Sequence, residues 1–190
     1  MMISNAKVLE LSKKYGLVEN LDERESNPEG VGLDIRAGEA YRIISEGYLG
    51  ISDRKSSDVE KIADIKNGDR EIIMEPGDFV LVKTMEIVNV PGEKVSLGDG
   101  SEPKYLAINV YPRSTLQRCG IYFMGTKTDP GYHGELTFAL ANMGKKQFRL
   151  ALGARIANIV FVQVTGEIYR AYGGQWKGGR VSTGGLENQV

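Results

Sequence analysis

Hydrophobic residues along this chain recur in short runs separated by turn residues, a pattern typical of β-strands. From Leu33 onward, apolar runs of strand length cover residues 72–74, 79–82, 87–90, 105–110 and 156–164. Glycine-containing turn signals follow at residues 76–78, 91–92, 98–100 and 130–131. This spacing predicts an all-β protein, an antiparallel barrel or sandwich, because alternating strand and helix units would need longer periodic segments between the strands.

One sizeable helix is predicted, over about residues 4 to 15. Ser4 is suited to capping its first turn, and Gly16 is suited to ending it. Val8, Leu9 and Leu11 give the helix a short apolar face.

Two segments depart from the strand pattern. Residues 52–70 are rich in charged and hydroxyl side chains and are interpreted as a solvated excursion between strands. Residues 171–190 are rich in glycine, which predicts a mobile arm that closes over an active site. The expected organisation is a β-barrel domain over residues 1–170 followed by this arm.

Composition narrows the function. The 190 residues are 41% hydrophobic, enough for a buried core in one domain, and the net charge is -1. No overall positive field attracts a nucleic-acid backbone, so a nucleic-acid partner is not expected and any anion site must be local. A lone Cys119, no signal-like start and no long apolar run predict a cytoplasmic protein outside the membrane.

Several reaction classes are excluded within one chain. His133 is the only histidine, so neither a Ser-His-Asp triad nor a zinc cluster with Cys119 can be assembled. The phosphate-binding sequences GxxxxGK[ST] and GxGxxG are also absent.

Arg113, Ser114, Thr115 and Arg118 form a candidate phosphate site. They follow a predicted strand and offer two guanidinium groups and two hydroxyls, which phosphate oxygens accept as donors. An equally plausible interpretation is that the arginines form structural ion pairs and Ser114 satisfies a turn.

Asp129 is the candidate general base. It precedes Pro130 and Gly131, a turn that places a carboxylate at a strand end, where it could take a proton from water. Aspartate in such a position can also be only a turn former. Tyr132 could stack on a sugar or fill the core.

The glycine-rich arm carries a third candidate group. Trp176, Lys177, Arg180, Ser182 and Thr183 supply a stacking face, charges and hydroxyls within eight residues. The arm could wrap a polyphosphate through its backbone N–H groups, or it could be a passive tail.

In order along the chain, five segments resemble the motifs of the dUTPase and dCTP deaminase superfamily, closest to archaeal-type dUTPases. They are residues 30–37, 111–116, 129–134, 153–158 and 178–184, and the resemblance runs from about Ser4 to Gly185. It implies a distorted jelly-roll β-barrel that forms a homotrimer, with each active site built by neighbouring subunits.

The resemblance also implies a substrate, dUTP or dCTP, and one position bears on the choice. Family deaminases have a glutamate about ten residues after the third-motif aspartate, where this chain has Ala139, and Glu135 lies four positions away. Hydrolysis of dUTP to dUMP and pyrophosphate is therefore favoured. The alternatives are a dCTP deaminase, including a bifunctional one that forms dUMP, and a non-catalytic nucleotide-binding regulator.

Residue roles follow from the same resemblance. Asp129 activates water, and Mg²⁺ is held chiefly by the substrate phosphates. Tyr132 packs against the deoxyribose, backbone near residues 121–129 reads uracil, and Arg113, Ser114 and residues 179–183 grip phosphates. Asp34 and Arg155 support the site, with Asp34 orienting a metal-bound water or another group. The chain departs from the family pattern at Asn158, which replaces a glutamine, and at Arg180 and Val181, which replace an aromatic residue and a glycine.

Overall fold

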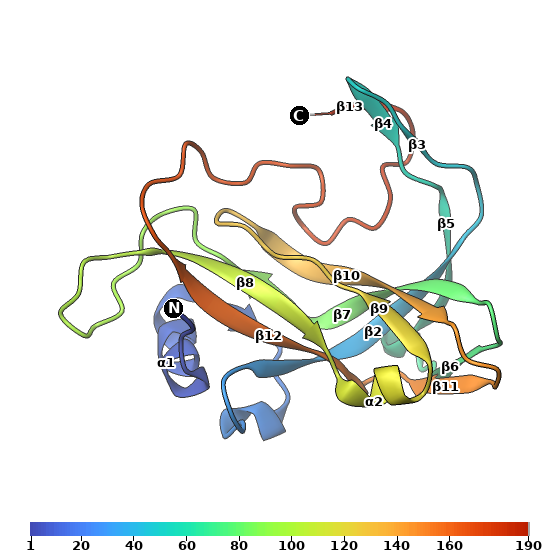
Figure 1. The fold of residues 1–190 in the computed structure, drawn as a ribbon, viewed down its shortest axis with the longest axis horizontal. Coiled ribbons are helices and arrows are strands. Elements are labelled where there is room, and N and C mark those ends of the chain that lie inside the picture. The colour runs from blue at the N-terminus through green and yellow to red at the C-terminus, as the bar shows by residue number, and fades with distance from the viewer. Residues whose placement is uncertain (190) are drawn as a thin grey trace.

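The computed structural model describes residues 1–189, and its architecture is an antiparallel, nearly closed barrel-like sheet (Figure 1). The main strands run in the order β8-β12-β2-β7-β10-β9, with β1 added to β7 and β5 added to β2. Their bounds are β1 (Val18–Glu19), β2 (Leu33–Ile43), β5 (Val59–Asp64), β7 (Phe79–Asn89), β8 (Tyr105–Pro112), β9 (Ile121–Met124), β10 (His133–Asn142) and β12 (Arg155–Val164).

The two ends of this sheet approach each other after β9. Thr128 and Ile108 of β8 exchange backbone hydrogen bonds of 2.9 and 3.0 Å, so the chain after β9 returns to the opposite edge strand. Along β10 buried and partly exposed residues alternate, and Phe138 and Leu140 point into the core. The predicted all-β fold is confirmed.

Helix α1 (Asn5–Tyr15) has the ends that its sequence predicted. The Lys7 N–H donates to Ser4 Oγ at 3.3 Å, and Gly16 ends the helix with φ of 61°. Val8 and Leu11 are buried. The described residues contain no helix long and apolar enough to cross a membrane.

The interpretation of residues 52–70 as a solvated excursion is wrong. They contain β4 (Asp53–Lys55), β5 and the short helix η2 (Ile65–Asn67). Ala63 and Asp64 are buried, and β5 pairs with β2. The charged residues Glu60 and Lys61 of this added strand are exposed, and their charge concealed the strand pattern.

Smaller elements complete the fold. Strand β6 (Glu71–Met74) pairs with β11 (Phe148–Ala151), and β4 lies between β3 (Tyr48–Leu49) and β13 (Glu187–Asn188). Two short helices that the pattern did not predict are η1 (Glu23–Ser26) and α2 (Ser114–Arg118). After β12 the chain passes above β10 and reaches β4, as the red end of the ribbon shows in Figure 1.

Candidate active site

A cavity of about 450 Å³ lies between the β7–β10 face of the sheet and the C-terminal arm, and we call it the aspartate cavity. It brings together the predicted base Asp129, the predicted sugar-binding Tyr132 and the arm residues Trp176 and Arg180. Its lining comprises Leu81, Thr126, Lys127, Thr128, Asp129, Tyr132, Leu136, Thr137, Phe138, Tyr172, Trp176, Arg180 and Val181.

Asp129 is the only carboxylate in that lining. The turn that follows it is fixed by a hydrogen bond from the Tyr132 N–H to the Asp129 carbonyl at 3.2 Å. The carboxylate is 42% exposed and forms an ion pair with Lys127. It is therefore open to water and lies beside a cation.

Tyr132 forms part of the cavity wall and is largely buried. Its hydroxyl donates to the Glu135 carbonyl at 2.5 Å, and its ring centroid is 5.8 Å from that of Tyr172. Burial raises the pKa of Tyr132 to about 12, with a further contribution from Tyr172 and Glu135. The phenol is thus neutral, and its ring presents a flat face to the cavity, which suits packing against a sugar.

The arm contacts the third-motif segment, residues 129–134, directly through backbone atoms. Gly178 donates its N–H to the His133 carbonyl at 2.6 Å. A Cβ on Gly134 would lie 2.7 Å from the carbonyl carbon of Gly178, and the φ of 143° at Gly134 disfavours other residues. Only glycine at this point lets the arm lie against β10 and cover the cavity.

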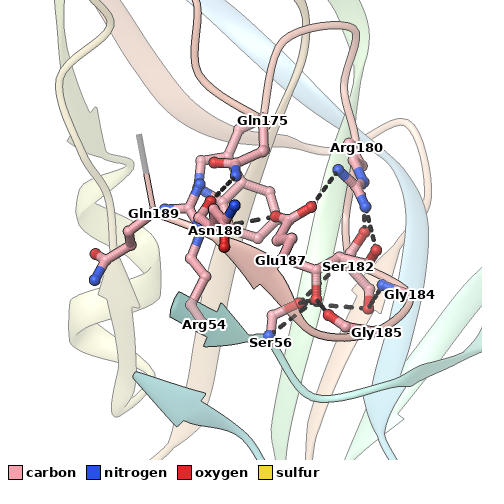
Figure 2. Close-up of polar contacts among 12 residues, drawn as sticks. Arg54, Ser56, Gln175, Arg180, Ser182, Gly184, Gly185, Glu187, Asn188 and Gln189 are labelled. Carbon is pink, nitrogen blue, oxygen red and sulfur yellow. Dashed lines mark hydrogen bonds and ion pairs between the residues drawn. The ribbon is translucent and has the colours of Figure 1, made fainter. Parts of the chain in front are cut away.

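Not every predicted arm residue faces the cavity. Arg180 lines it, but its guanidinium bonds to the carbonyls of Ser182 and Thr183 (Figure 2). The hydroxyl of Ser182 donates to the Ser57 carbonyl, and that of Thr183 accepts from the Ser56 N–H, both at 3.0 Å. Lys177 is exposed and outside the lining. The phosphate-binding roles of Lys177, Ser182 and Thr183 stay predictions.

A second cavity, of about 330 Å³, collects the predicted residues of the first, second and fourth motifs, and we call it the arginine cavity. Asp34 lies at its centre, 5% exposed. It accepts from Arg113 at 2.7 Å, from Arg155 at 3.1 Å and from the Asn158 amide at 2.9 Å. The interpretation that Arg113 forms an ion pair is thereby confirmed. Asp34 was expected to orient a metal-bound water or another group, and here it orients these three side chains.

The remaining phosphate candidates lie on α2 and face solvent. Ser114, Thr115 and Arg118 are exposed, and the Arg118 guanidinium donates to the Ser114 carbonyl at 3.3 Å. None of them lines either cavity. No residue is shared by the two linings, so one chain keeps the predicted base and the arginine cluster apart.

Sequence reasoning missed several residues of both cavities. Glu25, 4% exposed, accepts from the Asp34 N–H at 2.9 Å and adds a second buried carboxylate to the arginine cavity. Tyr172 and Lys127 complete the aspartate cavity. Nothing in the polar run around Glu25 distinguishes it from its exposed neighbours, whereas Tyr172, the only aromatic residue directly before the glycine-rich segment, was a usable signal.

A protein-held metal does not fit the described residues, which contain no group of three histidine, cysteine or acidic side chains that could hold one. Binding of Mg²⁺, chiefly by the substrate phosphates, stays a prediction.

The barrel order, the exposed aspartate before a tyrosine wall, the arginine cluster around a buried aspartate and the match to a family model define an enzyme of the dUTPase and dCTP deaminase superfamily. The model of the dCTP deaminase-like family matches residues 2–164, and the chain belongs to that family. The expected superfamily is confirmed.

Known relatives are dCTP deaminases. The chain is 30% identical to a dCTP deaminase of Halorubrum lacusprofundi, over 91% of this chain and 82% of the relative. It is 27% identical to a dUMP-forming dCTP deaminase of Dictyoglomus turgidum, over 82% and 76%. These names favour the deaminase alternative over dUTP hydrolysis.

A solved structure shows the same fold. The crystal structure of dCTP deaminase from Agrobacterium tumefaciens matches 84% of this chain with a TM-score of 0.58 and 15% identity. The chain spans 46% of that longer protein.

Proposed function

We propose that this enzyme hydrolyses dUTP to dUMP and pyrophosphate, with Asp129 as the base that activates water. The single observation that carries the proposal is that Asp129 is the only carboxylate lining the aspartate cavity, beside the flat, neutral Tyr132. Hydrolysis of the phosphoanhydride needs one general base near water. Deamination of the cytosine ring needs a further proton-transfer group beside that ring.

The groups near Ala139 do not supply that further group. Ala139 of β10 pairs with Leu81 of β7 and with Met124 of β9, and it has no titratable atom. Glu135 lies 3.6 Å from the Lys83 ammonium, and it is not part of the cavity lining.

In the proposed reaction, Asp129 takes one proton from water as the water oxygen bonds to the α-phosphorus. The bond from that phosphorus to the bridging oxygen breaks, and pyrophosphate leaves with the bonding electrons. Tyr132 holds the sugar, while Arg180 and Lys177 lie on the arm near the leaving group. Positioning and charge stabilisation supply most of the rate acceleration in such chemistry.

In this proposal each complete site combines the aspartate cavity of one chain with the arginine cavity of a second copy of the chain. Arg113 is held by Asp34 with its side chain still 40% exposed, so it can donate to a phosphate across an interface. A homotrimer, the assembly that the resemblance implies, would place that cluster against a neighbour's aspartate cavity.

Deamination of dCTP is the second candidate, and the names of the relatives favour it. It would need an acid-base group other than the family glutamate. A dUMP-forming variant would combine that step with the hydrolysis proposed above.

Release of pyrophosphate and ammonia from dUTP and dCTP separates the candidates. We expect pyrophosphate from dUTP, and a loss of roughly 10²-fold to 10⁴-fold in Asp129→Asn. Asp99→Asn, in an exposed loop, is the matched control and should keep full activity. Ammonia from dCTP would instead establish the second candidate, and binding without either product would indicate a regulator.

A further inference from the structure

The end of the arm is held by the β3–β4 hairpin (Figure 2). Glu187 and Asn188 of β13 pair with Arg54 and Asp53 of β4. The Gln189 N–H then donates to the Ser52 carbonyl at 2.8 Å. The last part of the described chain is therefore fixed to a hairpin more than a hundred residues earlier in the sequence.

Glu187 lies between two guanidinium groups. Its carboxylate is 3.6 Å from Arg54 Nε and 3.1 Å from Arg180 Nη1. The side chains of Arg54 and Glu187 are only 19% and 20% exposed, so solvent screens their attraction less than that of a surface pair. Of the two arginines, Arg180 reaches the aspartate cavity and Arg54 does not.

Arg54 instead reaches the cavity through Trp176. Its guanidinium carbon is 5.5 Å from the centroid of the indole ring, within the range of a cation–π contact. The preceding Gln175 donates its side-chain N–H to the Asn188 carbonyl at 2.6 Å. The ring of Trp176, a wall of the aspartate cavity, is therefore in contact with the hairpin, and its neighbour Gln175 is bonded to β13, which pairs with that hairpin.

We propose that Arg54 is a positioning residue: paired with Glu187, it holds Trp176 in place as a wall of the aspartate cavity and so strengthens nucleotide binding. The planar guanidinium is needed because it can stack on the indole while its edge faces the carboxylate, which a lysine ammonium cannot do. This inference rests on the proposed function for its substrate.

Trp176 is the only tryptophan of the chain, so its fluorescence reports on the contact without any substrate. In Arg54→Gln we expect the emission to shift to longer wavelength and acrylamide quenching to increase. Arg54→Lys should give a smaller change in the same direction. Arg149→Gln, which breaks an exposed pair with Glu71 on β11 and β6, is the matched control and should leave the emission unchanged.

The second measurement is steady-state dUTP hydrolysis. Loss of one cation–π contact at the wall should raise KM roughly threefold to tenfold and leave kcat within about twofold, because Arg54 lies outside the cavity. Glu187→Gln keeps the shape and removes the charge, so it should change emission and KM in the same direction, and it replaces Arg54→Gln if that variant does not fold.

Unchanged emission in both Arg54→Gln and Glu187→Gln would overturn the proposal. A changed emission with an unchanged KM would also overturn it, since Arg54 would then only pack the arm. A wild-type protein that does not hydrolyse dUTP would contradict the proposed function separately. The emission of Trp176 titrated with a non-hydrolysable dUTP analogue would then replace KM as the measure of binding.

Discussion

Asp34 organises three motif side chains with one buried carboxylate. Arg113, Arg155 and Asn158 come from β12 and the segment after β8, and all donate to its two oxygens. The shortened amide at Asn158 is used here for a contact with Asp34. The first-motif aspartate therefore fixes the orientation of both arginines and of this amide.

Replacing this carboxylate should destabilise the fold. We expect Asp34→Ala to lower the free energy of unfolding by about 3 kcal/mol, the lower end for breaking a buried ion pair, because both guanidiniums retain access to water. Urea denaturation measures the change. Glu71→Ala, at the exposed pair with Arg149, should cost about 1 kcal/mol or less, and equal losses in both variants would contradict the role given to Asp34.

Tyr132 should stay protonated well into the alkaline range. Its pKa of about 12 in the folded protein exceeds the ordinary value of about 10, so the folded state keeps a proton that the unfolded chain loses. This contribution to stability is complete below pH 10 and is lost as the pH rises toward 12.

Carbon-13 NMR of the tyrosine ring tests this expectation. The Cζ resonance of Tyr132, assigned by its absence in Tyr132→Phe, should not move between pH 8 and about pH 10.5. A titration of that resonance centred near pH 10 would show that the ring is not buried as described.

Turn chemistry made Asp129 and Tyr132 predictable at the residue scale, because a Pro-Gly pair after an aspartate fixes where the carboxylate projects. Glu25 was not predictable. In the fold its carboxylate accepts a hydrogen bond from the Asp34 N–H. This bond forms only when η1 lies near β2, and the local pattern of polar residues does not indicate it.

At the scale of elements, the contact between β10 and the arm depends on glycine. Gly134→Ala should push the arm away from the cavity, because its Cβ would overlap the backbone of Gly178 and Gly179. Strain at such a position costs about 1–3 kcal/mol, so trypsin should cleave after Lys177 and Arg180 roughly tenfold faster.

Gly173→Ala provides the control for that experiment. Nothing lies within 4 Å of a Cβ at Gly173, and its backbone needs no unusual φ. Its cleavage rate should equal that of the wild type. An arm that is cut equally fast in wild type and Gly134→Ala would mean that the glycine contact does not hold it.

The elements differ in how far sequence could predict them. The capped helix α1 and the strands of the main sheet followed from local periodicity and turn residues. Strand β13 could not be predicted from the glycine-rich arm, because its two residues become a strand only by pairing with β4. Long-range pairing of this kind leaves no trace in a local pattern.

At the scale of the whole molecule, the separation of the two cavities makes a prediction about assembly. If neighbouring chains of a trimer share each site, the mass measured by analytical ultracentrifugation should be about three times the 20.9 kDa mass of the chain. Asp129→Asn and Arg113→Ala should each be inactive alone and should recover roughly a quarter of wild-type activity when co-expressed. In randomly mixed trimers about one site in four combines an intact Asp129 of one chain with an intact Arg113 of its neighbour.

Separately purified and unmixed variants provide the baseline for the complementation. No recovery after co-expression, with trimers present, would mean that each chain builds its site alone. A monomeric wild-type protein with full activity would have the same meaning.

The arm that crosses the aspartate cavity touches β10 through backbone atoms, and this has a consequence for how the protein can diversify. At this point of the arm the contact is made by the backbone of glycines, so it does not depend on neighbouring side chains that form no bond of their own. Val181, which lines the cavity, can therefore differ from the family pattern without loss of that contact, whereas Arg180 also bonds to Glu187 and to the carbonyls of Ser182 and Thr183. Selectivity for different nucleotides could thus evolve, or be engineered, by exchanging a few cavity-facing residues on a path that stays constant.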